Sequence, residues 1–301
     1  MVLKEFKEEE LKKLYKPQKD STKEDNGKIV IFGGSGLFHG APIFSLKVAS
    51  RIVDMVFFAS PEPSVGRVAE KIKSKLNSFI WVPFDEVEEY IKKSDAVLIG
   101  PGLMRFHRET QNAKRKTQNE LDKIGLESKK ITERLLQRFP EKQWVIDAGS
   151  LQVMKPKFIS KNAILTPNQR EFEMLFGETR NTQHATRKTE NILHIASHVS
   201  RIAKEDHCII VLKNIDTLVC SPKKCVVVKG GNAGLTKGGT GDVLAGLAVA
   251  LVAKNPPFLA ACAAAYLTKK TADELHKKVG FAYNADDLAE EIPRVLGKYW
   301  R

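Results

Sequence analysis

The sequence predicts an α/β fold in three layers, with a central and mostly parallel β-sheet between two layers of helices. From about residue 28 onward, short runs rich in β-branched residues alternate with helical stretches. The runs are continuously apolar, as is typical of strands covered on both faces. Strands that alternate with helices indicate βαβ units, whose strands lie parallel.

The apolar runs give the predicted strands in chain order. They are KIVIF from Lys28, MVFFA from Met55, FIWV from Phe79, AVLIG from Ala96, WVID from Trp144, AIL from Ala163 and CIIVL from Cys208. Two later runs, TLVCS from Thr217 and CVVVK from Cys225, are joined by PKK and predict an antiparallel hairpin. Helices are expected after it at about residues 242–253, 257–278 and 285–297.

The length allows one large domain or two smaller ones, and because no internal repeat or long low-complexity linker divides the chain we expect one α/β domain over residues 26–301, preceded by a polar helix and arm over residues 1–25. Hydrophobic residues make up 42% and charged residues 28% of the 301 residues, which is a globular composition. No apolar run reaches the ~18–20 residues that a membrane span requires. The first residues are charged and lack the apolar stretch of a signal peptide. We therefore expect a cytoplasmic protein with no membrane partner.

The net charge of +13 raises the question of a nucleic-acid partner. Much of the excess is scattered lysine, and in residues 105–138 basic and acidic groups alternate as on a solvated helix. No aromatic and basic motif accompanies the charge, so we expect no nucleic acid. The four cysteines lack metal-ligand spacing and are expected to be small buried hydrophobic residues: Cys208, Cys220, Cys225 and Cys262.

The first glycine cluster, IVIFGGSGLFHGAP, is a strand, a turn and the start of a helix. Gly34, Gly36 and Gly40 are spaced almost like a dinucleotide fingerprint, with Asp54 twenty positions after Gly34. However, Asp54 stands before its strand, whereas the ligand crevice of such folds opens at the carboxyl ends of the strands. A Rossmann dehydrogenase is therefore disfavoured. The turn remains either a floor for a small ligand or a tight connection and nothing more.

The second glycine cluster, GGTGD at residues 238–242, lies directly before a strongly helical run. Glycines at this place let backbone N–H groups converge on an anion, which the helix dipole also favours. Asp242 falls in the first helical turn, where it suits capping. A carboxylate beside an anion site also makes sense as a base that accepts a proton from an attacking hydroxyl group.

GGTGD followed by VLAG resembles the G-x-G-D signature of ribokinase-like enzymes. The stretches around it resemble one branch, the ADP/ATP-dependent NAD(P)H-hydrate dehydratases, and they occur in the family's order over roughly residues 20–275. They are DNGKIVIFGGSG with HGAP, DAVLIGPGLMR, WVIDAGSL, ILTPNQREFEMLFG, IVLKNIDTLVCSP and NAGLTKGGTGDVLAGLAVAL.

The resemblance implies a ribokinase-like α/β/α fold, a homo-oligomer and a lyase that repairs hydrated NADH or NADPH. In that chemistry ATP or ADP with Mg²⁺ phosphorylates the C6 hydroxyl of the hydrated ring, and loss of phosphate restores the ring. The implied catalytic residues are Asp242 as base with Gly239 and Gly241 as anion hole. The implied nucleotide site comprises Gly241 with Lys213, Asn214, Ile215, Asp216 and Thr217. The implied substrate site comprises Ala41, Gly102, Asn168 and Asp242.

Asn168 departs from the family, which generally has His at this position. TPNQRE resembles instead the Asn-x-x-Glu motif of ribokinase-like small-molecule kinases, in which Glu171 would organise Mg²⁺ through water. Glu171 equally suits a helix N-terminus. A kinase acting on a vitamin precursor or a sugar-like alcohol is therefore the alternative. A non-catalytic nucleotide-binding protein is disfavoured, because binding alone does not require Asp242.

Further departures surround the expected substrate. Asn214 replaces a glycine, Met104 replaces a glycine and could narrow the pocket, and residues 22–24 lack the family's His-Lys-Gly. Asp147 ends a buried strand where the crevice should open, but the second acid that often follows is Gly149 here. The sequence thus predicts phosphoryl transfer more firmly than it predicts the molecule that accepts the phosphoryl group.

Overall fold

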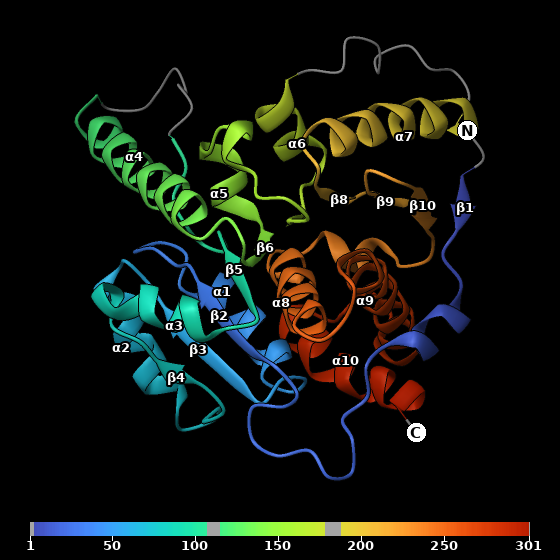
Figure 1. The fold of residues 1–301 in the computed structure, drawn as a ribbon, viewed down its shortest axis with the longest axis horizontal. Helices are drawn as coiled ribbons and strands as arrows, with labels where there is room; N and C mark the ends of the chain where they lie inside the picture. The colour runs from blue at the N-terminus through green and yellow to red at the C-terminus, as the bar shows by residue number, and fades with distance from the viewer. Residues whose placement is uncertain (1–2, 107–114, 178–187, 301) are drawn as a thin grey trace.

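The structure, a computed structural model, describes residues 3–106, 115–177 and 188–300 (Figure 1). Ten strands form one sheet in the order β1-β10-β9-β8-β7-β6-β5-β2-β3-β4. The strands are β1 (Lys4–Glu5), β2 (Lys28–Phe32), β3 (Met55–Ala59), β4 (Ile80–Trp81), β5 (Ala96–Ile99), β6 (Gln143–Ile146), β7 (Ile164–Leu165), β8 (Ile209–Leu212), β9 (Thr217–Cys220) and β10 (Cys225–Val228).

The sheet is parallel from β4 to β8, and β9 is antiparallel to both β8 and β10. The predicted late hairpin and the mostly parallel sheet are confirmed. β2 lies between β3 and β5, so the chain first extends the sheet in one direction and then in the other. Such a switch point leaves a crevice beyond the carboxyl ends of the neighbouring strands.

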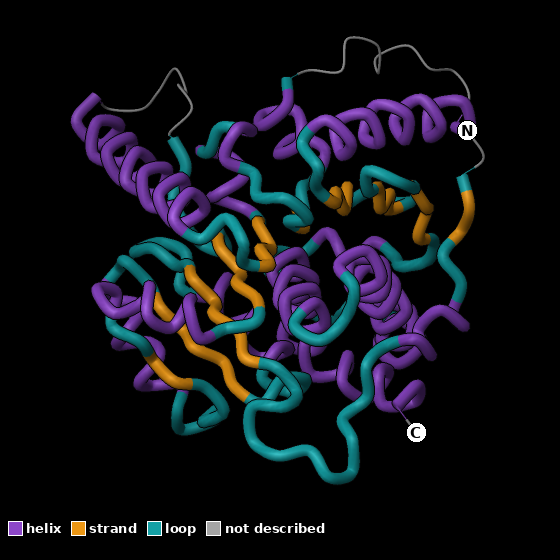
Figure 2. Tube along the Cα trace, viewed as in Figure 1, coloured by secondary structure: helices purple, strands orange, loops and turns teal. Residues whose placement is uncertain are grey.

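Ten α-helices in the described ranges form the two outer layers, as Figure 2 shows around the strands. They are α1 (Gly40–Ala49), α2 (Pro63–Ile72), α3 (Val87–Lys93), α4 (Arg115–Arg138), α5 (Ala148–Val153), α6 (Gln169–Phe176), α7 (Lys188–Glu205), α8 (Thr240–Val252), α9 (Pro257–Val279) and α10 (Ala285–Trp300). Short 3₁₀ helices include Glu8–Lys13 and Ala233–Thr236.

The two layers enclose separate hydrophobic cores. Helices α1, α2, α8, α9 and α10 pack on one face of the sheet, and α3 to α7 pack on the other. β2 shows why its run had to be apolar throughout: Ile29 and Ile31 enter the first core, while Val30 and Phe32 enter the second. Helix α8 is buried along almost its whole length, so its N-terminus is held rigidly against the sheet.

The first residues of the chain join the sheet. β1 pairs parallel with β10, and Phe6, Leu11 and Leu14 are buried in the core beside α9 and α10. This strand was not predicted, because Lys4 and Glu5 are charged and belong to no apolar run. Within the described ranges, no helix has the length and apolar character needed to cross a bilayer.

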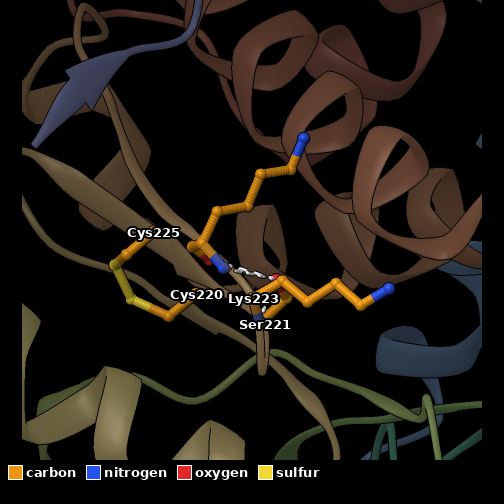
Figure 3. Close-up of a disulfide and its surroundings, with 5 residues drawn as sticks. Cys220, Ser221, Lys223 and Cys225 are labelled. Carbon is orange, nitrogen blue, oxygen red and sulfur yellow. Dashed lines mark hydrogen bonds between the residues drawn. A yellow bond between two sulfur atoms is a disulfide. The ribbon is translucent and has the colours of Figure 1, made fainter.

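All four cysteines are buried, as predicted. Cys208 and Cys262 are free and buried, as expected. Cys220 and Cys225, however, form a disulfide across the β9–β10 hairpin (Figure 3). The antiparallel register places the two residues directly opposite each other, which the linear spacing did not reveal.

Candidate active site

The site lies at the carboxyl edge of the parallel strands. β2 leads into Gly33, β5 into Gly100, β6 into Asp147, β7 into Thr166 and β8 into Lys213. Since parallel strands end at the same edge, residues far apart in the chain meet there. Asp54 is at the other edge, where its carboxylate accepts a hydrogen bond from the Asn26 N–H at 2.8 Å. The argument against a dinucleotide site is thereby confirmed.

The N-terminus of α8 faces this edge. Gly239 caps the helix in the left-handed conformation, with φ at 93°. A Cβ atom there would lie 2.6 Å from the Phe44 ring and 2.7 Å from Ala285, so glycine is required. In the described part of the chain, no side chain caps this helix. Its first-turn amides and dipole therefore suit an anion.

Asp242 is placed by α1. The Ser45 hydroxyl, fully buried in α1, donates to the Asp242 backbone carbonyl at 2.7 Å. At Gly246, one turn along, a Cβ atom would lie 2.4 Å from the Cα of Ser45. The two helices thus cross at van der Waals contact, which fixes the first turn of α8. The sequence analysis missed Ser45, since nothing local marks it.

An ion pair between a half-buried lysine and a buried aspartate faces the helix. The Lys213 ammonium donates to Asp147 Oδ1 at 2.9 Å, and Asp147 is only 1% exposed. The same oxygen accepts from the Thr166 hydroxyl at 2.7 Å. A Cβ atom on Gly241 would lie 3.3 Å from the Lys213 ammonium, so the lysine reaches the predicted anion hole. The fold thus brings Lys213, Gly241 and Asp147 together.

Asn168 and Glu171 cap the N-terminus of α6. The Asn168 side chain accepts from the Glu171 N–H at 2.9 Å, and the Glu171 carboxylate accepts from the Asn168 N–H at 2.9 Å. This capping box is the helix-start role considered from the sequence. Glu171 also accepts from Gln152 at 3.0 Å and lies 3.8 Å from the Lys213 ammonium. One residue therefore both caps a helix and adds charge to the site.

Burial and the neighbouring carboxylates shift the pKa values of Asp242 and Lys213. Burial, followed by the negative charge of Asp147, raises the pKa of Asp242 from 3.8 to about 7, although Lys213 opposes the shift. Burial would lower the pKa of Lys213, but the surrounding carboxylates, Asp147 foremost, raise it above its ordinary value. Lys213 therefore stays charged, while Asp242 can take up and release a proton near neutrality.

The predicted substrate positions border the glycine turns. Gly102 has φ at 73°, and a Cβ atom there would lie 2.5 Å from the Phe38 carbonyl and 3.1 Å from the Cα of Gly34. The turns after β2 and β5 thus touch. Ala41 is the second residue of α1, whose start lies beside that of α8 because Phe44 touches Gly239. A Cβ atom on Gly149 would lie 2.1 Å from the Leu103 carbonyl, which explains why no acid occupies this position.

The expected nucleotide segment, residues 213–217, follows β8. Asn214 and Ile215 are exposed, Ile215 by 80%, whereas Thr217 is buried at the start of β9. The Ile215 N–H donates to the Asn214 side chain at 2.8 Å, a contact that a glycine at position 214 could not make. This departure from the family pattern therefore stiffens the loop.

The described residues contain no group of three or more His, Cys, Asp or Glu side chains able to hold a metal ion. Both Glu171 oxygens already accept protein hydrogen bonds. These observations fit a Mg²⁺ ion held by phosphate oxygens and water, because Mg²⁺ keeps several of its waters. Each Glu171 oxygen keeps a second lone pair that a water on the ion could donate to.

Comparisons with solved structures define the class of protein. A ribokinase-like superfamily protein from Enterococcus faecalis aligns with a TM-score of 0.75 at 20% identity, over 99% of this chain and 96% of that one. An ADP/ATP-dependent NAD(P)H-hydrate dehydratase from Bacillus subtilis, co-crystallised with ATP/Mg²⁺, aligns with a TM-score of 0.74 at 23% identity, over 99% of both chains. The fold is therefore ribokinase-like, as predicted.

Sequence comparison narrows the class. The model of the NAD(P)H-hydrate dehydratase family matches residues 29–294, so the chain belongs to this family. It is 35% identical to the bifunctional NAD(P)H-hydrate repair enzyme Nnr of Methanocaldococcus jannaschii, over 95% of this chain but only 51% of that protein. It is 30% identical to the ADP-dependent (S)-NAD(P)H-hydrate dehydratase of Cenarchaeum symbiosum, over 94% of this chain and 93% of that protein. The chain spans about half the length of the bifunctional relatives.

Proposed function

We propose that this protein converts hydrated NADH or NADPH back to the intact cofactor at the expense of ATP or ADP. The observation that carries the proposal is the meeting of Asp242, the amides after Gly239 and the ammonium of Lys213 at one sheet edge. The family membership supports the hydrated cofactor as the acceptor.

The residues divide the chemistry between them. The Asp242 carboxylate accepts the proton of the C6 hydroxyl while that oxygen attacks the terminal phosphoryl group. The Gly239–Gly241 amides and Lys213 stabilise the charge on the phosphoryl oxygens. The C6–O bond then breaks, inorganic phosphate leaves, and the adjacent ring carbon loses a proton to restore the double bond. Mg²⁺ bound with the nucleotide would neutralise phosphate charge, with its waters near Glu171.

The nucleotide would lie along residues 213–217, and the hydrated ring between Ala41, Gly102 and Asn168. The side-chain oxygen of Asn168 accepts the helix-cap hydrogen bond, which leaves its second lone pair and its NH2 group for a substrate. The family resemblance also supports a cytoplasmic homo-oligomer. Light scattering of the purified protein measures the subunit number.

The test is to incubate the protein with hydrated NADH, Mg²⁺ and either ATP or ADP, and to follow absorbance at the NADH band. We expect recovery that requires nucleotide and releases phosphate in equal amount. Nucleotide consumption that leaves a stable phosphorylated product would instead identify the small-molecule kinase. Recovery without nucleotide would contradict the proposal.

A further inference from the structure

Lys269 is a buried cation that the mechanism above does not use. It lies in α9 and is only 6% exposed. Its ammonium donates to three backbone carbonyls, those of Ile215 at 2.6 Å, Gly230 at 2.9 Å and Asn214 at 3.4 Å. Burying an ammonium group is unfavourable unless its three donors find acceptors, and here each finds one.

The three carbonyls belong to two separate loops. Asn214 and Ile215 lie in the nucleotide segment after β8, and Gly230 follows β10 on the way to the glycine cluster. Gly231 has φ at 77°, and a Cβ atom there would lie 3.1 Å from Cγ of Lys269. The second loop therefore rests directly on the lysine stem, and only glycine fits at this point.

The next turn of α9 also binds the loop that follows β10. Asp273 accepts from the Gly231 N–H at 2.9 Å and from the Asn232 side chain at 3.3 Å. Asn232 in turn accepts from the Gly234 N–H at 3.0 Å and from the Tyr283 hydroxyl at 2.7 Å. One face of α9 thus fixes the segment that ends at the N-terminus of α8.

We propose that Lys269 is a positioning residue that sets the nucleotide loop relative to the anion-binding amides of α8. All three donors of its ammonium are taken by backbone carbonyls, which leaves none for a phosphate or a substrate. Because the C=O and N–H groups of a trans peptide point in opposite directions, holding the Ile215 carbonyl on Lys269 turns the Asp216 N–H away from α9. The loop is thereby ordered before the nucleotide arrives, which lowers the entropy cost of binding. This inference rests on the proposed nucleotide site.

The test measures binding of ADP with Mg²⁺ by calorimetry, without hydrated cofactor, in Lys269→Met and Lys269→Ala. Lys269→Met keeps the apolar stem, and we expect it to weaken ADP binding by about tenfold to a hundredfold, the effect of a small displacement of a positioned group. In activity assays the KM for nucleotide should rise while the KM for hydrate stays near that of the wild type. Lys277→Met is the matched control, since Lys277 is an exposed lysine of the same helix.

Chemical rescue separates positioning from general stability. Ethylammonium should restore ADP affinity to Lys269→Ala, which leaves space for it, and not to Lys269→Met. ADP affinity of Lys269→Met equal to that of the wild type would overturn the proposal, as would a failure of rescue in folded Lys269→Ala. If neither variant folds, Lys269→Gln decides in the same way: unchanged ADP affinity overturns the proposal and weakened affinity supports it. ADP binding is read without the dehydratase reaction, so a failure of the positioning role can be told apart from a failure of the proposed function.

Discussion

The two glycine clusters look alike in the sequence and differ in the structure. Both precede a helix, α1 in the first case and α8 in the second; the first follows β2 directly, whereas the 3₁₀ helix Ala233–Thr236 separates the second from β10. In the first cluster, a Cβ atom on Gly33 would lie 2.1 Å from the Pro101 carbonyl, and the Gly34 N–H donates to the same carbonyl at 2.8 Å. Those glycines let two turns pack together.

The second cluster is surrounded by charge. Lys213, Asp147 and Asp242 interact there, and the pKa of Asp242 is raised by burial and by Asp147. Beside the first cluster, by contrast, Leu37 and Phe38 are exposed by 68% and 49%. The comparison teaches that glycines before a helix indicate phosphate chemistry only where titratable groups converge on the same helix start.

The largest effect is expected from the carboxylates beside each cluster. Asp242→Asn removes the base and should lower kcat by about 10²–10⁴-fold. Glu62 stands beside the first cluster, with its carboxylate 3.8 Å from a Cβ atom built on Gly36, and it caps α2. Glu62→Gln should keep most of the activity. Steady-state kinetics of both variants gives the two values of kcat. An equal loss of kcat in Glu62→Gln and Asp242→Asn would show that the two clusters do not differ in function.

The glycines themselves should differ in stability. Gly239→Ala meets Phe44 and Ala285 with φ at 93°, and we expect it to lower the free energy of unfolding by about 2–4 kcal/mol. Gly36→Ala has open space and should change it by less than about 0.5 kcal/mol. Urea unfolding of the two variants provides the measurement. A Gly239→Ala protein as stable as the wild type would show that the tight helix start is unnecessary.

The pH dependence tests the charge at the second cluster. Since Asp242 must lose its proton to act and its pKa is about 7, kcat/KM should fall by about tenfold per pH unit below neutrality. Asp147→Asn removes a charge that raises this pKa, so the fall should move to lower pH. Rate profiles of the wild type and of Asp147→Asn check this shift. If kcat/KM of Asp147→Asn falls at the same pH as that of the wild type, Asp147 does not raise the pKa of the group that controls the rate.

The smallest effect concerns stability. A carboxyl whose folded pKa exceeds its ordinary 3.8 destabilises the fold as pH rises between those two values. Asp242→Asn should therefore be more stable than the wild type by about 1–2 kcal/mol at pH 8, with the gain mostly lost at pH 4. Thermal or urea unfolding at both pH values measures it. If Asp242→Asn were less stable than the wild type at pH 8, the claim that the ionised Asp242 carboxylate destabilises the fold would be contradicted.

Nine of the ten strands were predictable, because each is an apolar run long enough to stand out; β1 is two residues of a polar segment. The end of the strand from Trp144 also identified Asp147, and the family resemblance identified Lys213. Their ion pair joins residues 66 positions apart, so only the folded sheet reveals it. The same holds for Ser45 beneath Asp242, for the Cys220–Cys225 bond and for Lys269, since their roles depend on partners that neither spacing nor composition indicates.

The most direct measurement of the central claim follows the hydroxyl oxygen. Hydrated NADH labelled with oxygen-18 at the C6 hydroxyl is incubated with the protein, Mg²⁺ and nucleotide, and the released phosphate is examined by mass spectrometry. If the hydroxyl guided by Asp242 attacks the phosphoryl group held at α8, the label leaves in the phosphate. Label found in water, with unlabelled phosphate, would contradict the account.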